Sequence, residues 1–172
     1  MIRLVICLIM VLWTCASQAQ KLESVSMNAG RLRITVDPRM ELLCAVQSIS
    51  GYPFIDRTNS YTREMMQFFR NDTAQEAVKL TAWLANEAGF AHDAPLDLIL
   101  RLSEVPELKQ NSPYTPRTIE RAGNTENLEM YRLALKQFAA KSGFMSFWSS
   151  KIPFYEKMVK YTADDLAGYD PV

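Results

Sequence analysis

The segment VDPRMELLCAVQSISGY, from Val36 to Tyr52, determines how the fold begins. Asp37 followed by Pro38 is typical of a helix N-terminus, because aspartate accepts hydrogen bonds from the first free N–H groups and proline has none to leave unpaired. Gly51 can adopt the left-handed conformation that ends a helix. Apolar residues recur on one helical face between these signals, at Leu42, Leu43, Val46 and Ile49. We therefore predict a helix over residues 38–50.

The residues before this helix alternate in polarity. Leu32, Ile34 and Val36 alternate with Arg31, Arg33 and Thr35, which is the period of a half-buried strand. The run from Leu22 to Met27 is a weaker strand pattern, and Asn28-Ala29-Gly30 lies between the two runs. The sequence predicts a short N-terminal β-hairpin or a single strand.

The rest of the chain is typical of helices. Thr73 and Glu76 match a capping box at the start of one helix, and Asp93 is the expected cap of a short one. The prolines of residues 103–124 indicate a long irregular loop, of a kind that is often functional or mobile. Helical spacing predicts helices over residues 60–70, 73–88, 93–100 and 125–141, and a last segment from Phe144 to about Leu166 that Pro153 breaks. The expected fold is mainly α, with five or six helices around one core.

Length and composition favour one domain over residues 20–172. The chain has 172 residues, of which 48% are hydrophobic and 22% charged, as in ordinary globular proteins. Its 19 basic and 19 acidic side chains cancel. This balance gives no electrostatic case for binding nucleic acid or an anionic membrane surface.

The N-terminus has the pattern of a signal peptide over residues 1–19. A positive charge at Arg3 precedes the apolar run Leu4–Trp13, and Ser17-Gln18-Ala19 supplies small residues for cleavage after Ala19. We therefore expect export to the periplasm, outer envelope or extracellular space, with no transmembrane helix after cleavage. An uncleaved anchor is one alternative. Lipidation at Cys15 is another, although the bulky Trp13 fits such a signal poorly.

The cysteines and histidine limit the chemistry of the mature chain. Cleavage removes Cys7 and Cys15 and leaves Cys44, so no intramolecular disulfide can form. Cys44 lies beside an apolar helix face and is expected to be a buried small side chain. His92 is the one histidine, which excludes a His-Glu-x-x-His zinc site within this polypeptide.

Several polar or aromatic groups admit a functional and a structural interpretation. His92 with Asp93 could be a catalytic base pair, but a loop residue before a helix cap is favoured. Asp164-Asp165 could be half of a carboxylate site, but a solvated helix face is favoured. Asn71-Asp72-Thr73 matches a glycosylation sequon and is interpreted as turn and cap. An aromatic group could form a platform for sugars or peptides, but core packing is favoured: Phe144, Phe147, Trp148, Phe154 and Tyr155. We assign no catalytic, cofactor-binding or metal-binding residue.

The order of these features resembles a known family. The resemblance rests on Val36–Leu43 with Gly51-Tyr52, on Tyr61 with Phe68-Phe69, on His92–Leu96, and on Leu135, Phe138-Ala139, Phe144, Phe147-Trp148 and Tyr155. Over residues 32–165 the chain resembles the N-terminal half of domain of unknown function 4932, a family of exported proteins found mainly in gut-type Gram-negative bacteria. Each motif is short, so the specificity comes from their order.

The resemblance implies a function for full-length relatives. Their later half carries a zincin-like His-Glu-x-x-His helix, which implies a zinc-dependent peptidase-like protein. This sequence ends at Val172 before such a region, so no zinc ligand is carried over and no cofactor is expected in this chain. We expect a truncated or split product: the non-catalytic helical N-terminal region of an exported metallopeptidase-like protein. Its expected partner is the missing C-terminal half or a peptide or protein substrate. The alternative is a stand-alone envelope binding or structural module.

Overall fold

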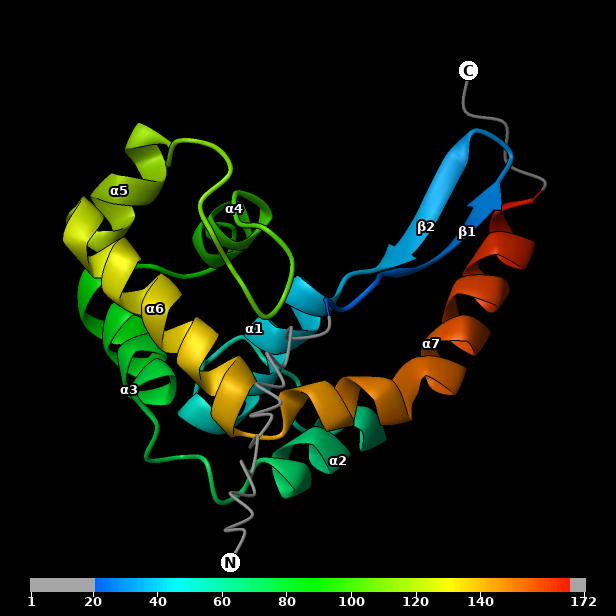
Figure 1. The fold of residues 1–172 in the computed structure, drawn as a ribbon, viewed down its shortest axis with the longest axis horizontal. Coiled ribbons are helices and arrows are strands. Elements are labelled where there is room, and N and C mark those ends of the chain that lie inside the picture. The colour runs from blue at the N-terminus through cyan, green and yellow to red at the C-terminus, as the bar shows by residue number, and fades with distance from the viewer. Residues whose placement is uncertain (1–20, 168–172) are drawn as a thin grey trace, which may run out of the picture.

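The computed structural model describes residues 21–167 and has a mainly α fold with a two-stranded hairpin (Figure 1). The predicted signal peptide (1–19), with its cysteines, lies outside the described residues, as do Gln20 and residues 168–172. The predicted fold class is confirmed, with seven α-helices in the described part in place of the five or six expected. The elements are β1 (Val25–Ala29), β2 (Leu32–Val36), α1 (Pro38–Ser50), α2 (Ser60–Phe68), α3 (Glu76–Trp83), the π-helical turn η1 (Leu84–Ala88), α4 (Ala94–Leu100), α5 (Pro116–Ala122), α6 (Thr125–Lys141) and α7 (Phe144–Leu166).

The predicted helix α1 is the centre of the fold. Asp37 caps it, since its Oδ1 accepts the N–H of Arg39 at 2.8 Å, and Gly51 ends it with φ 82°. Leu42, Leu43 and Val46 are at most 1% exposed. Helices α2, α3, α4, α6 and α7 pack against α1, most extensively α3. The apolar face of α1 is part of one hydrophobic core.

The hairpin separates polar from apolar residues. β1 and β2 pair antiparallel, with Ala29 opposite Leu32 and Val25 opposite Val36. Gly30, with φ 58°, and Arg31 make the turn, because glycine tolerates the left-handed conformation that a two-residue hairpin turn requires. Alternation places Val25 and Met27 on one face and Ser26 on the other.

Two predicted helix caps are wrong. The helix expected from Thr73 begins at Glu76, with Gln75 at the cap position and no capping side chain. A turn replaces the capping box there, because the Gln75 N–H donates to the Asp72 carbonyl at 3.0 Å. Asp93 has helical dihedrals and makes no cap bond; its carboxylate instead pairs with two arginines.

The segment predicted as an irregular loop, residues 103–124, contains helix α5. Thr115 caps it and Pro116 is its first residue, where proline favours a helix. The preceding residues are not a loose loop either. Val105 and Leu108 are fully buried, and Leu102 bridges to Gln110.

The break predicted at Pro153 does not occur, since α7 is continuous from Phe144 to Leu166. A proline inside a helix removes one hydrogen bond and bends it, and Figure 1 shows that α7 bends along its length. Buried side chains on both sides of the proline, Trp148 and Tyr155, hold the two halves in place. The second half leaves the helical body and runs beside β1, so hairpin and helix form a projecting arm.

The aromatic group is mostly core, as predicted. Phe144, Phe147, Trp148 and Tyr155 are at most 1% exposed. Phe144 and Phe147 pack on Phe69, which also packs on Phe138, and Trp148 packs on Tyr155. The exception is Phe154, which is 40% exposed and stacks on the ring of Tyr61 at 4.9 Å.

Candidate functional site

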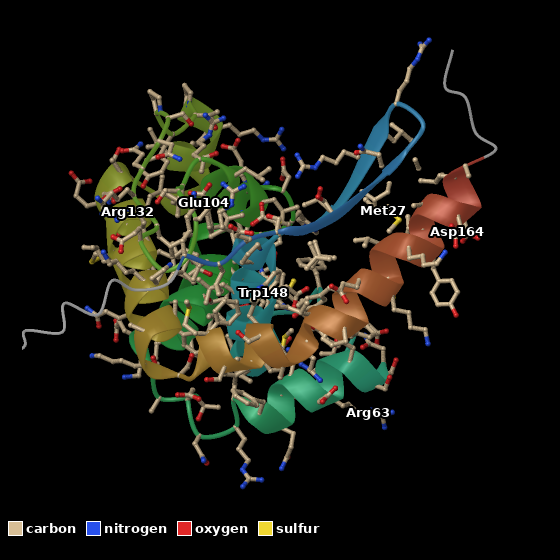
Figure 2. All side chains as sticks on the ribbon, turned by 45° about the vertical axis from the view of Figure 1, so that its right-hand side comes forward. Met27, Arg63, Glu104, Arg132, Trp148 and Asp164 are labelled. Atoms are coloured by element: carbon tan, nitrogen blue, oxygen red, sulfur yellow. The ribbon has the colours of Figure 1, made fainter. Side chains whose placement is uncertain are left out.

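A groove of about 760 Å³ lies along β1 and the second half of α7. This β1–α7 groove is lined by five consecutive residues, Glu23–Met27, and by Ile152, Pro153, Glu156, Lys157, Val159 and Lys160 of the helix. Figure 2 shows Met27 on the side of the hairpin that faces α7. The volume of the groove is within the range of about 300–1,000 Å³ that small-ligand sites occupy.

The main chain of β1 borders this groove. Side chains of a strand alternate between two faces, so five consecutive residues line one hollow only where the strand edge itself faces it. Ala29 and Leu32 flank the two-residue turn and therefore form a hydrogen-bonded pair. Because such pairs alternate along a hairpin, the N–H and C=O groups of Val25, Met27 and Ala29 point at β2. The groups of Ser24, Ser26 and Asn28 point the other way. Within residues 21–167 they have no hydrogen-bond partner.

The groove has an apolar floor. Val159 is 3% exposed beneath it, and Val25 is partly buried against the core. Met27 leaves 41% of its surface exposed although it belongs to the apolar face of the hairpin. The arm therefore presents apolar surface next to unpaired main-chain groups.

The groove is lined by charged side chains of both signs. Figure 1 shows that β1 and α7 both run from the helical body towards the hairpin tip. Glu23 lies at the start of the strand wall, and on the helix wall Glu156 is directly followed by Lys157, so acidic and basic groups lie side by side. Lys160 lies about one turn further towards the tip. Lys160 pairs with Asp164 at 2.7 Å, and Lys157 lies over the ring of Tyr161.

A partly buried polar cluster lies where α1, α2 and α7 meet. Oε2 of Glu41 accepts the hydroxyl of Tyr61 at 2.6 Å and that of Tyr155 at 3.3 Å, and the two hydroxyls are 2.8 Å apart. Burial raises the pKa of Glu41, and the two tyrosine hydrogen bonds partly oppose that rise. Sequence reasoning missed this cluster, because a glutamate in the first turn of a helix is ordinary. The cluster fastens the base of the arm to the body.

The proposed base pair of His92 and Asp93 is not assembled. His92 is exposed, has φ 58°, and stacks on Phe54 with ring centroids 3.9 Å apart. Its main-chain N–H donates to the hydroxyl of Tyr52 at 2.8 Å. Asp93 instead pairs with Arg121 at 2.6 Å and Arg117 at 3.1 Å. Each side chain thus has its own structural partner, as the favoured interpretation expects.

The other candidate side chains also lie where a structural role is expected. Burial, together with the charge of Glu41, raises the pKa of the Cys44 thiol to about 12. Asp164 and Asp165 are exposed, on a solvated helix face as predicted. Asn71 is exposed in a turn.

Residues 21–167 contain no group of three or more histidine, cysteine, aspartate or glutamate side chains arranged to hold a metal ion. None of the helices in that range combines the length and apolar character that a membrane span needs. Comparisons with family models, with curated proteins and with solved structures found no match. The resemblance to domain of unknown function 4932 therefore stays a prediction.

Sequence reasoning did not identify the β1–α7 groove. Its two walls are far apart in the sequence, and nothing in either segment alone indicates that they meet. One signal was present: the polar residues Ser24, Ser26 and Asn28 alternate with apolar ones in the weaker strand, which is a pattern of an edge strand.

Proposed function

We propose that this chain is the non-catalytic helical part of an exported metallopeptidase-like protein and that it holds a polypeptide in the β1–α7 groove. The polypeptide is a protein substrate or the catalytic part of the same assembly. The observation that supports this role is the strand edge that lines the groove, since unpaired main-chain groups beside apolar surface suit a polypeptide.

The surroundings of the reactive side chains support a non-catalytic role. The thiol of Cys44 stays protonated at neutral pH, because its pKa is raised to about 12. The carboxylate of Glu41 is held by two tyrosine hydroxyls, and that of Asp93 by two arginines. These groups serve the packing of α1, α4, α5 and α7.

The second candidate function is a stand-alone binding module of the envelope. The same groove favours it, because polypeptide binding there needs no catalytic partner. Reading the DNA downstream of the Val172 codon separates the two. A continuation, in frame or frameshifted, that encodes His-Glu-x-x-His supports the peptidase-like assembly, and unrelated sequence favours the module.

Polypeptide binding is tested with purified residues 20–172 and a fluorescent, reduced and carboxymethylated reporter protein that cannot fold. We expect saturable binding by fluorescence anisotropy and no cleavage of the reporter on gels. Ser24→Trp, which fills the groove from an exposed position, should abolish binding. Thr35→Trp, an exposed position on β2 outside the groove, is the matched control and should bind normally. Cleavage of the reporter, or equal binding by both variants, contradicts the proposal.

A further inference from the structure

The sequon Asn71-Asp72-Thr73 lies in the turn between α2 and α3, and Thr73 has no capping role there. Helix α3 begins at Glu76, and no side chain caps it. Among residues 21–167 the Thr73 hydroxyl has no hydrogen-bond partner. The interpretation as turn and cap therefore holds for the turn alone, and the packing does not explain the threonine.

The middle residue of the sequon holds this turn together. The Asp72 N–H donates to the carbonyl of the buried Phe69 at 2.9 Å, and the Asp72 carbonyl accepts the N–H of Gln75 at 3.0 Å. The Asp72 carboxylate also accepts the side-chain amide of Gln75. Asn71 and Thr73, on either side, are exposed. The turn thus has a fixed main chain and presents both outer side chains of the sequon to an enzyme in solution.

The side-chain amide of Asn71 has no structural partner in the part of the chain that the structure describes. Other asparagine amides are engaged: Nδ2 of Asn59 donates to the Asp56 carbonyl at 2.9 Å, and Nδ2 of Asn127 donates to the Ala122 carbonyl at 2.7 Å. Asn71 is also the one asparagine in the sequence that begins an Asn-x-Ser/Thr sequon. An enzyme that recognises this sequon therefore has one acceptor in the chain, and that acceptor is accessible.

We propose that Asn71 is the acceptor of an N-linked glycan and that the free Thr73 hydroxyl is the group through which the transferase recognises it. This inference goes beyond the proposed function and rests on the predicted export of the chain. The donor is an oligosaccharide activated as a lipid diphosphate. Nδ2 of Asn71 bonds to the anomeric carbon as the bond from that carbon to the diphosphate oxygen breaks. The lipid diphosphate leaves with the electron pair, and one amide proton passes to a base of the transferase.

A glycan at Asn71 is compatible with a ligand in the β1–α7 groove. Figure 1 shows the connection between α2 and α3 on the lower side of the helical body, whereas the hairpin projects at the upper right. The glycan and the groove therefore lie on different sides of the molecule. We expect glycosylated and unglycosylated protein to bind the unfolded reporter equally.

The site is tested on the mature protein purified from the organism that encodes it. Cleavage after Glu64 and Glu76 by a glutamyl endopeptidase gives residues 65–76, in which both candidate acceptor side chains are internal. We expect mass spectrometry with electron-transfer fragmentation to find a glycan in this peptide and to place it on Asn71 rather than on Thr73.

Variants at Thr73, expressed in the same organism, test how the acceptor is recognised. Thr73→Ala removes the hydroxyl and should abolish the glycan although Asn71 is unchanged. Thr73→Ser keeps a hydroxyl and should retain the glycan. Both replacements are at an exposed position, so the unglycosylated chains should unfold at the same temperature, as measured by circular dichroism.

Each outcome decides the proposal. An unmodified Asn71 in the wild type overturns it, and so does a glycan attached to Thr73. A glycan on Asn71 that persists in Thr73→Ala overturns recognition through the hydroxyl. Loss in Thr73→Ala with retention in Thr73→Ser supports the proposal. None of these results depends on reporter binding, so the proposed function can fail while this inference holds.

Discussion

The hydroxyl of Tyr61 donates to Oε2 of Glu41 at 2.6 Å, so one carboxylate joins α2 to the first turn of α1. Tyr155 of α7 approaches the same oxygen at 3.3 Å. Because α7 carries one wall of the β1–α7 groove, this cluster fixes the arm relative to the body. Its stability is coupled to pH, since burial raises the pKa of Glu41 above its ordinary value of 4.5.

Replacing Glu41 with glutamine should flatten the dependence of stability on pH. A raised pKa in the folded state means that the folded protein binds the proton more tightly than the unfolded chain. The contribution of Glu41 is therefore fully present below its ordinary value of 4.5 and is lost as pH rises through the folded pKa. As pH rises through this window, we expect the melting temperature of the wild type to fall relative to that of Glu41→Gln, as measured by circular dichroism.

The control for this measurement is Glu120→Gln, at an exposed position on α5. Its pH profile should match that of the wild type. A Glu41→Gln profile parallel to the wild type over the same window would show that burial of this carboxylate does not affect stability.

The buried pair of Thr81 and Tyr131 predicts unequal effects of two mutations. Their hydroxyls are 2.7 Å apart, and that of Thr81 also donates to the Ala77 carbonyl at 2.8 Å. Tyr131→Phe removes one hydrogen bond and should cost about 1 kcal/mol of unfolding free energy. Thr81→Val leaves the tyrosine hydroxyl buried without a partner and should cost about 2–3 kcal/mol.

Urea denaturation of both single variants and of the double variant measures these costs. The double variant should lose less than the sum, because the second mutation removes the unpaired hydroxyl that the first creates. Strict additivity would contradict a direct hydrogen bond between the two side chains.

The neighbours Phe68 and Phe69 distinguish core packing from an aromatic platform. Phe69 is fully buried and contacts Phe138 and Phe147, whereas Phe68 is 45% exposed. We expect Phe69→Ala to lower the unfolding free energy by about 3–5 kcal/mol, and Phe68→Ala by about 1 kcal/mol. Denaturant unfolding gives both values. Phe69→Leu, expected to cost about 1 kcal/mol, keeps the comparison possible if the alanine variant does not fold. Equal costs at the two positions would contradict this placement of the core.

The sequence predicted those parts of the fold whose signals are local. Asp37, Pro38 and Gly51 mark the ends of α1, and its apolar spacing identifies the buried face. The sequence could not distinguish two roles of one residue type. Pro116 starts α5 although it was interpreted as a breaker, and Asp93 pairs with arginines rather than capping α4. Partners distant in sequence decide such cases, and the same holds for the β1–α7 groove and for the Glu41 cluster.

Cys44 should be almost unreactive in the folded protein. Burial and the negative charge of Glu41 raise its pKa from 9.0 to about 12, so at about pH 8 the thiolate fraction falls about a thousandfold. We expect monobromobimane to label purified residues 20–172 slowly in buffer and rapidly in concentrated urea, measured by fluorescence. Cys44→Ser sets the background of the assay, and Glu41→Gln should label somewhat faster in buffer because one opposing charge is gone. Native and unfolded rates within about tenfold of each other would show that the thiol is accessible and ionises normally.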